Sequence, residues 1–371
     1  MKFRCERDVL VEAVSVAERA VATRSGALPV LSGVEISASD RTLDIVGSDL
    51  ELTIRVQVPA EVAEPGRVVV PAKLFDAVVS RLRAGAVDVE TDGDDLCVRG
   101  GAARVTVRLL AADDFPRIAT PTGSATEIAT EPFVEALRQV IPAASRDDAR
   151  PILTGVLLTS TGAGLRLVAT DSYRLAVRDV PGLGLVGTGD RVLVGARALA
   201  EVQRTFGTGP LRVTWGERDV EFTNDLRWVH ARLIEGEFPN YEQLIPAGHP
   251  NRLTIAKAAL EEAIRLMQTI GERDTTPVRF SIGAAGVEVS ASSQERAEAT
   301  ETLDGKYEGN DVRVAFNPQF LLEGILAVPG EEVVIELVDN DPGADLVLKP
   351  AVIRGAEGDE FRYILMPVRV S

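Results

Sequence analysis

The chain has 371 residues, of which 45% are hydrophobic and 26% charged, and a formal net charge of −16. This composition is typical of a globular protein, and the length predicts two to four domains. We expect no membrane span, because no window approaches the ~20 apolar residues that one requires, and no signal peptide. Cys5 and Cys97 are too few for a disulfide framework, which favours a cytoplasmic location. So acidic an average charge argues against nucleic acid as a partner, unless basic residues gather on one surface.

The predicted elements recur in the same order three times along the chain. Helical patterns come first, at residues 7–24, 132–150 and 257–273. Strand–turn–strand patterns follow, around Asp49, Asp171 and Ser293. A short strand leading into a second helix comes next, at residues 67–83, 191–206 and 312–328. Both intervals between the three turn residues are 122 residues, which is the period of whole domains and not of a solenoid.

Segments rich in Pro, Thr and Gly close the first two units, near residues 121 and 250. We therefore predict three domains, at residues 1–121, 122–250 and 251–371. Each contains two helical patterns and about eight short strands, which predicts an α+β fold with helices on one face of antiparallel sheet.

Two segments resemble ligand-binding motifs. Gly182, Gly184 and Gly187 match the G-x-G-x-x-G fingerprint, but Pro181 precedes them and a strand pattern follows, so a loop is favoured over a dinucleotide site. The segment 339–345 has carboxylates at alternate positions, as in a calcium loop, but lacks the downstream glutamate and is typical of a turn. Asp92, Asp94 and Asp95 receive the same interpretation.

Candidates for catalysis are few. His230 lies in an alternating strand and His249 in a Pro-rich segment, and the sequence contains no nucleophile elbow, P-loop lysine or zinc-protease motif. We expect no catalytic residues, no metal site and no cofactor, and hence no enzyme.

Charge is unevenly distributed over the predicted elements. The six helical stretches together carry a net charge of +2, so the rest of the chain carries −18. This leaves two interpretations open: the ordinary mixture of charges on helices, or helices that face an anionic partner while the outside stays acidic.

Seven segments spread along the chain resemble one known family. They are MKFRCERDVL, LPVL, VVVPAKLF, DDFPRI, VATDSYRLAVRD, EFPNYEQLIP and YILMPVRVS. Together they are similar to the bacterial DNA polymerase III beta subunits, the DNA sliding clamps, over essentially the whole chain. The resemblance implies three tandem clamp domains, and a head-to-tail homodimeric ring with helices lining the hole and antiparallel sheet outside. It implies a non-catalytic clamp that encircles duplex DNA without sequence preference and confers processivity.

It also implies partners that bind through a short linear motif: the polymerase III alpha subunit, the clamp loader, other polymerases and repair proteins.

The resemblance also implies residue roles. It places a partner-peptide pocket at Leu153, Thr170, Ser172, Tyr173, Arg174, Leu175, Pro239, Gln243, Leu244, Ile364, Met366, Pro367, Val368 and Arg369, with both arginines as donors at its rim. It places DNA-facing cations at Arg24, Lys73 and Arg197, and dimer contacts at Val105, Val107, Thr269 and Ile270. Tyr173 and Gln243 depart from residues found in some family members, which bears on the selectivity of the pocket.

Three other functions remain open on sequence alone. The chain could be a specialised or antibiotic-resistance paralogue of the clamp, or a scaffold of clamp fold that does not embrace DNA. A third interpretation is an enzyme that uses the loop at Gly182.

Overall fold

The computed structural model describes residues 1–22, 28–118, 121–184, 191–246, 248–271, 276–284, 286–293, 297–338 and 349–369. The chain forms two compact units, Met1–Glu131 with Arg197–Leu233, and Pro132–Ala196 with Ile234–Ser371. Its described residues contain six α-helices, which are α1 (Arg7–Glu18), α2 (Ala72–Arg81), α3 (Thr130–Val140), α4 (Ala196–Thr205), α5 (Lys257–Ile270) and α6 (Pro318–Ala327).

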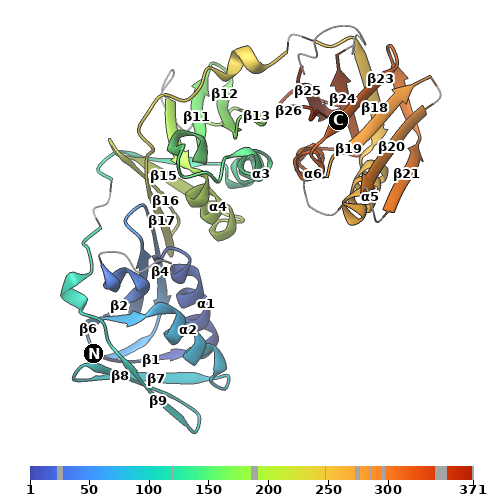
Figure 1. The fold of residues 1–371 in the computed structure, drawn as a ribbon. Coiled ribbons are helices and arrows are strands. Elements are labelled where there is room, and N and C mark those ends of the chain that lie inside the picture. The colour runs from blue at the N-terminus through green and yellow to red at the C-terminus, as the bar shows by residue number, and fades with distance from the viewer. Residues whose placement is uncertain are drawn as a thin grey trace. The chain divides into compact units, whose positions relative to one another are not determined.

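The first unit contains two antiparallel sheets (Figure 1). The order of the five-stranded sheet is β5 (Glu61–Glu64), β1 (Lys2–Glu6), β7 (Ala86–Asp92), β8 (Asp95–Gly100) and β9 (Ala103–Arg108). The order of the eight-stranded sheet is β10 (Ala125–Ile128), β15 (Leu211–Trp215), β16 (Asp219–Thr223), β17 (Arg227–Arg232), β4 (Leu52–Pro59), β3 (Thr42–Ser48), β2 (Gly33–Ser39) and β6 (Gly66–Pro71).

The second unit also contains two antiparallel sheets. The order of the nine-stranded sheet is β14 (Arg191–Gly195), β11 (Gly155–Thr161), β12 (Gly164–Thr170), β13 (Arg174–Pro181), β26 (Phe361–Leu365), β25 (Ala351–Gly355), β24 (Glu332–Leu337), β18 (Asn251–Ala256) and β22 (Gly305–Glu308). The order of the four-stranded sheet is β21 (Ala297–Leu303), β20 (Gly286–Ser293), β19 (Val278–Gly283) and β23 (Val312–Phe316).

The order of elements along the chain reveals a repeat finer than the predicted one. A strand, a helix and three strands recur six times, in β1–β4, β6–β9, β10–β13, β14–β17, β18–β21 and β23–β26, with one helix each and with β5 and β22 as short additions. Each predicted third of the chain therefore holds two of these βαβββ repeats. The sequence patterns predicted only the threefold period, because the strand–turn–strand pattern was recognised only in the first repeat of each third.

Two of the sheets are continuous because the last strand of one repeat pairs with the last strand of another repeat. We call each such pairing a joint. In the first joint, β17 pairs with β4, from Arg227 opposite Val56 to Ala231 opposite Leu52. In the second joint, β13 pairs with β26, from Arg174 opposite Leu365 to Arg178 opposite Phe361. Two last strands remain, β9 and β21, and each lies at the edge of its sheet.

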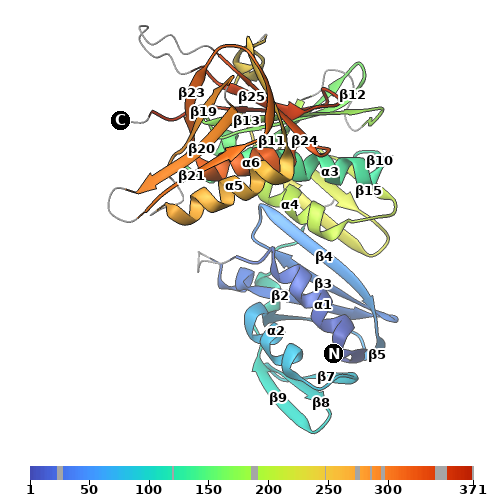
Figure 2. The same ribbon diagram turned by 90° about the vertical axis from the view of Figure 1, so that its right-hand side faces the viewer.

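The helices pack in pairs against the sheets. Figures 1 and 2 show α1 beside α2 in the first unit and α5 beside α6 in the second. On α5, the buried residues Leu260, Ala263, Ile264 and Met267 are spaced three or four apart, as one apolar face requires. Close approach of α1 to β3 depends on Gly47, because a Cβ there would lie 2.0 Å from the carbonyl oxygen of Ala17.

All six predicted helices are present, but two predictions were wrong in length. The pattern at 7–24 predicted a longer helix than α1, which ends at Glu18 and is followed by a turn. The pattern at 132–150 predicted a single long helix, whereas α3 ends at Val140 and a short 3-10 turn, Ile141–Ala143, follows. Pro142 accounts for the difference, because its ring clashes with the preceding turn of an α-helix and it has no N–H to donate. None of the helices in the described ranges is both long enough and apolar enough to cross a membrane.

Candidate functional site

A tight turn before β13 holds one side chain out into solvent. The Oδ1 atom of Asp171 accepts hydrogen bonds from the backbone N–H groups of Tyr173 (2.9 Å) and Arg174 (3.0 Å). Ser172, between them, has a φ of +82°, a conformation that costs free energy for a residue with a side chain. As a result Tyr173 is 62% exposed, while Leu175, two residues on, is buried.

Beneath this turn lies an apolar cluster that spans the second joint. Its buried members come from both sides of the joint and from the linker that follows Ile234, and they are Leu157, Val168, Leu175, Val177, Leu193, Phe238, Tyr241, Val352 and Ile364. The linker residues are held by a 3-10 turn, η5 (Tyr241–Leu244), and the rings of Phe238 and Tyr241 meet edge to face at 6.4 Å. The cluster forms an apolar floor that contains two of the predicted pocket residues, Leu175 and Ile364.

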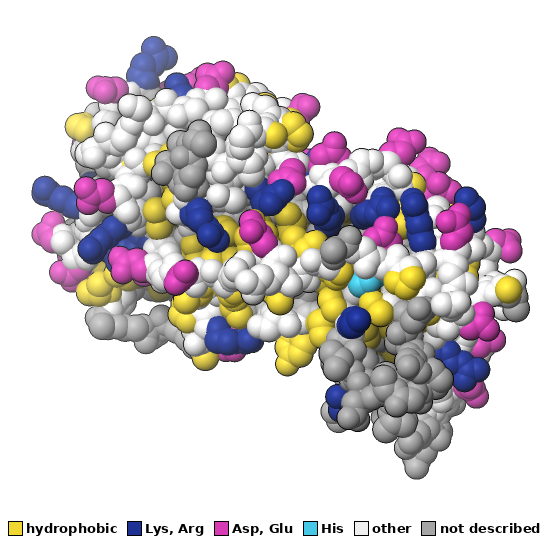
Figure 3. Space-filling model, turned by 90° about the horizontal axis from the view of Figure 1, so that it is seen from above, with side chains coloured by type: hydrophobic (Ala, Val, Ile, Leu, Met, Phe, Trp, Pro, Cys, Tyr) yellow, Lys and Arg dark blue, Asp and Glu magenta, His cyan; other side chains and the backbone are white. Residues whose placement is uncertain are grey.

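The predicted rim residues surround this floor on two segments. Pro239, Gln243 and Leu244 are exposed on the linker that carries Phe238 and Tyr241. Met366, Pro367 and Val368 are half-buried in the tail after β26, and Arg369 is exposed. The tail is fixed because the N–H of Met366 donates to the carbonyl oxygen of Tyr173 (2.9 Å) and that of Val368 donates to Ala315 (2.8 Å). In the view of Figure 3, hydrophobic side chains gather in a band beside Lys and Arg side chains.

The remaining predicted residues of the pocket are largely shielded from solvent. Leu153 is 9% exposed, and Thr170 is buried, where its hydroxyl donates to the carbonyl oxygen of Arg174 at 2.6 Å. The sequence missed Phe238 and Tyr241, although these are the two aromatic residues of the segment EFPNYEQLIP, and their size is the signal that could have marked them as buried.

One predicted role was wrong: Arg174 is not a donor at the rim. Its side chain is buried and lies below the turn, where the guanidinium packs 4.1 Å from the centre of the Phe320 ring. It donates to Oδ2 of Asp171 at 3.0 Å, to a carboxylate oxygen of Glu323 on α6, and to the carbonyl oxygen of Pro142. The predicted rim contains a single arginine, Arg369.

The environment of Arg174 keeps it charged. Burial alone lowers the pKa of a guanidinium, but Tyr363 and Glu323 offset this and raise the pKa of Arg174 above its ordinary value. Burial also raises the pKa of Tyr363, so its hydroxyl stays protonated and donates to the carbonyl oxygen of Phe320 at 2.8 Å. The group is therefore a permanent buried cation with several partners, and breaking such a set is destabilising.

The predicted DNA-facing residues have three different outcomes. Arg24 lies outside the described residues. Lys73, in the first turn of α2, is exposed. Arg197 is exposed as well, but its guanidinium donates to the carboxylate of Asp49 and to the carbonyl oxygen of Arg19 at 3.0 Å. The charge of Arg197 is therefore already matched by a carboxylate within the first unit.

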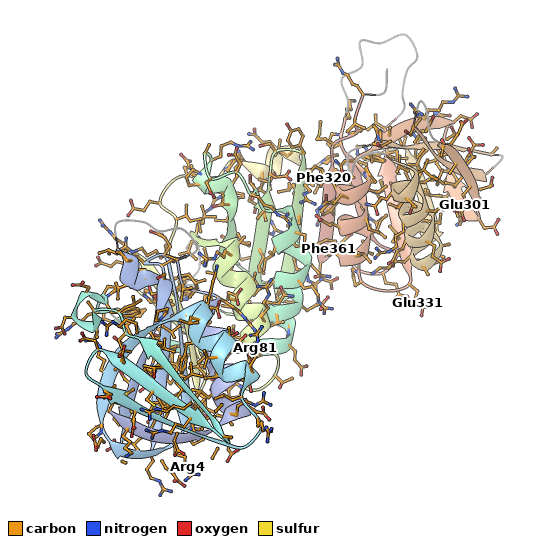
Figure 4. The ribbon with its side chains drawn as sticks, turned by 60° about the horizontal axis from the view of Figure 1, so that its bottom comes forward. Arg4, Arg81, Glu301, Phe320, Glu331 and Phe361 are labelled. Carbon is orange, nitrogen blue, oxygen red and sulfur yellow. The ribbon has the colours of Figure 1, made fainter. Side chains whose placement is uncertain are left out.

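The predicted dimer residues lie on or beside the two last strands at sheet edges, β9 and β21. Val105 is half-buried and Val107 fully buried on β9, so the side chain of Val107 belongs to the core of its own unit and only its backbone lies at the sheet edge. Thr269 is exposed and Ile270 half-buried at the end of α5, which packs on β21. Glu301 on β21 is labelled in Figure 4, as are Arg4 and Arg81 of the first unit.

The other sequence motifs add no chemistry within the described residues. Gly182 has a φ of +73° and follows β13, while Gly187 and the segment 339–345 lie outside the described residues. Asp95 pairs with Arg108 at 3.2 Å, His230 with Asp219 at 3.1 Å, and the ring of His249 hydrogen-bonds the carbonyl oxygen of Pro350. Among the residues placed by the structure, no group of three or more His, Cys, Asp or Glu could hold a metal ion.

Comparisons with known proteins agree along the full length. Residues 1–119 match the N-terminal domain of the DNA polymerase III beta subunit, residues 127–240 its central domain and residues 242–369 its C-terminal domain. The chain belongs to the DNA polymerase III beta subunit family. It is 34% identical to the beta sliding clamp of Streptomyces coelicolor, with 100% of both chains covered. It is 29% identical to the beta sliding clamp homolog GriR of Streptomyces muensis, covering 100% of this chain and 99% of that protein.

A solved structure extends the agreement to three dimensions. The DNA polymerase sliding clamp from Bacillus subtilis superposes with a TM-score of 0.90 at 26% identity, and 100% of each chain is covered. The prediction of an α+β sliding clamp of DNA replication, built from clamp domains, is thus confirmed. The boundaries at residues 121 and 250 and the residue roles remain predictions.

Proposed function

We propose that two copies of this chain close head to tail into a ring around duplex DNA, and that the pocket at the second joint recruits replication and repair proteins to it. The ring tethers a polymerase to its template and carries out no chemistry itself. The account requires no cofactor, and we place it in the cytoplasm, where the nucleoid lies. The single observation that carries the ring is the pairing of the six last strands. Four of them pair with one another at the two joints, whereas β9 and β21, within the described residues, have a neighbouring strand on one side only.

The two remaining strands are suited to each other. Within the chain, each joint pairs the last strand of the first repeat of one domain with the last strand of the second repeat of another. By this rule β21, from the first repeat of the third domain, is the partner of β9, from the second repeat of the first domain. Within the described residues β9 and β21 do not pair with each other, so we assign β21 to the β9 of a second copy. A heterologous contact of this kind closes into a ring when the rotation is right.

Charge supports the same pairing. β9 carries Arg104 and Arg108 and no acidic residue, whereas β21 carries Glu298 and Glu301 and no basic residue. Exposed edge strands ordinarily repel copies of themselves through such charges, and opposite charges on two edges favour one partner over self-pairing.

We assign the apolar floor at the second joint to a short linear segment of partner proteins. Leu175 and Ile364 provide buried apolar surface, and Met366 adds a flexible side chain that adapts to different bulky residues. Tyr173 and Leu244, 62% and 50% exposed, are large apolar side chains that a bound peptide would cover. Gln243 and Arg369 are polar groups positioned for a glutamine or a backbone carbonyl of the partner.

The DNA contact is proposed to be weak and independent of sequence. Lys73 and Arg24 would meet phosphates and not bases, and topology would retain the ring where affinity alone would not. The assembly is tested by sedimentation equilibrium at micromolar concentration. A single species of twice the chain mass is expected. A monomer that persists to high concentration, or a ladder of open oligomers, would contradict the closed pair.

A further inference from the structure

The two joints begin with the same turn. At the second joint, Oδ1 of Asp171 accepts from the N–H of Arg174 at 3.0 Å, and at the first joint, Oδ1 of Asn224 accepts from the N–H of Arg227 at 2.9 Å. The carbonyl oxygen of the residue before each arginine accepts a hydrogen bond from across the joint: that of Tyr173 from Met366, and that of Leu226 from Gln57. Arg174 and Arg227 therefore occupy equivalent positions, each as the first residue of a joint strand.

The two arginine side chains make equivalent contacts. Arg174 reaches Glu323 on α6, the helix of the opposing repeat, and the carbonyl oxygen of Pro142, just after the helix of its own repeat. Arg227 reaches Glu12 on α1 of its opposing repeat at 2.5 Å, and the carbonyl oxygen of Thr205, the last residue of the helix of its own repeat, at 3.4 Å. Each arginine thus connects two helices and one strand across a joint, and we call this set of contacts the clasp.

The two clasps differ in burial. The Arg174 side chain is 6% exposed and Glu323 24%, whereas Arg227 is 30% exposed and Glu12 63%. Arg174 has two further neighbours, the ring of Phe320 and the hydroxyl of Tyr363 at 3.3 Å. Figure 4 shows Phe320 on α6 and Phe361 on β26, the strand that carries Tyr363. Gly324 permits this packing, since a Cβ there would lie 2.5 Å from the Tyr363 ring.

The buried clasp lies directly beneath the pocket. Arg174 stands between Tyr173, an exposed residue of the rim, and Leu175, a buried residue of the floor. Its partners on α6 and after α3 do not belong to the pocket, so the guanidinium connects the position of those helices to the backbone that presents Tyr173 and Leu175. Without it, the carboxylates of Asp171 and Glu323 would lie close together with no cation between them, and their repulsion would displace the turn.

We propose that Arg174 is a positioning residue for the partner pocket: through the clasp it holds the turn at Asp171–Arg174 against α6, so that floor and rim keep the shape that a bound segment requires. This inference rests on the proposed pocket. Arg227 has the same role at the first joint, where the tail and η5 are absent and no pocket is assigned, and it provides a matched control from the same chain.

The test compares R174Q with R227Q in the full-length protein. The probe is a fluorescein-labelled peptide with one glutamine followed by leucine and phenylalanine, and binding is measured by anisotropy at 25 °C alongside circular dichroism and Tm. We expect R174Q to weaken peptide binding at least tenfold and R227Q to change it less than twofold. E323Q should also weaken peptide binding. The double variant R174Q/E323Q should bind no worse than R174Q, because both substitutions break the same ion pair between Arg174 and Glu323. R174K, which keeps the charge but not the fork of donors, should fall between the wild type and R174Q.

Each other outcome overturns one specific claim. Folded R174Q that binds like the wild type overturns the positioning role, and so does equal weakening by R174Q and R227Q, which would mark a general loss of stability. If R174Q fails to fold, E323Q and R174K decide the question, and wild-type affinity in a folded E323Q overturns the inference. If M366A binds the peptide as well as the wild type, the pocket assignment has failed and not the clasp.

Discussion

The backbone N–H of Met366 donates to the carbonyl oxygen of Tyr173 at 2.9 Å, and this bond marks the point where the C-terminal tail leaves the sheet. Its counterpart at the first joint, from Gln57 to Leu226 at 2.8 Å, lies within a strand that simply continues to Pro59. We propose a pocket only at the second joint, where a tail departs and where Phe238 and Tyr241 of the linker pack into the apolar cluster.

This comparison gives the first prediction. The double substitution Tyr173→Ala with Met366→Ala should reduce peptide affinity at least tenfold, because it removes two apolar side chains that are not part of the fully buried core. Leu226→Ala, at the position equivalent to Tyr173 and 54% exposed, is the matched control and should leave affinity unchanged. The measurement is isothermal titration calorimetry, and the double variant should still form the dimer. Loss of the dimer with peptide binding intact would mean that the site is misplaced.

The second prediction concerns the edge strands. Reversing Arg104 and Arg108 to Glu should raise the dimer dissociation constant by at least tenfold, because four like charges would then face each other at each interface. Adding Glu298→Arg and Glu301→Arg should restore the dimer, since the pattern is inverted and again complementary.

Arg4→Glu is the control for charge alone. Arg4 is exposed on β1, which lies inside the same five-stranded sheet and has strands on both sides. Sedimentation velocity at several salt concentrations provides the measurement. If the quadruple variant dissociates as far as the double, β9 and β21 do not meet.

Much of the fold follows from the sequence, for reasons that particular residues make clear. Asp49 and Asp171, 122 residues apart, both accept backbone N–H groups at the turn before a joint strand, so the recurring motif was a recurring structure. Part of the apolar floor was predicted as well, because the resemblance of the tail segment to the clamp family pointed to Ile364, which is buried, and to Met366, which is half-buried.

The failures have physical causes as well. Nothing in ATDSYRLAV distinguishes an exposed arginine from a buried one, because the burial of Arg174 depends on Glu323 and Phe320, about 150 residues away in sequence. The same holds for Arg197, whose partner Asp49 is supplied by the preceding domain. Long-range ion pairs have no local signature, whereas turns and periodic faces do.

The third prediction separates Lys73, which we propose to face DNA, from Arg197, which only the family resemblance placed there. Lys73→Gln should lower the slope of log K against log salt by about one for each phosphate that the lysine neutralises, whereas Arg197→Gln should change the slope less, because Asp49 already holds that guanidinium. Fluorescence anisotropy of a labelled duplex at low protein occupancy measures both. An equal change in slope for the two variants would mean that Arg197 leaves Asp49 when DNA is present.

The fourth prediction concerns pH. Burial, assisted by the carboxylate of Glu6, raises the pKa of Cys5 from 9.0 to about 11. Between pH 9 and 11 the Cys5 thiol therefore keeps its proton in the folded protein, whereas the unfolded chain has lost it. The free energy of unfolding that is linked to this thiol is fully present below pH 9 and falls as pH rises towards 11. The free energy of unfolding in urea should fall less between about pH 8 and about pH 10.5 for Cys5→Ala than for the wild type. Identical losses would show that Cys5 does not contribute.

The central claim is that the protein stays on DNA by encircling it. The direct measurement is to place the protein on a nicked circular plasmid with a clamp loader and ATP, isolate the complex in high salt, and cut the circle with a restriction enzyme. The account predicts that the protein is retained on the circle in salt that abolishes phosphate contacts, and leaves the DNA within minutes of linearisation. Equal loss from the intact circle and the cut one, or retention on both, would contradict it.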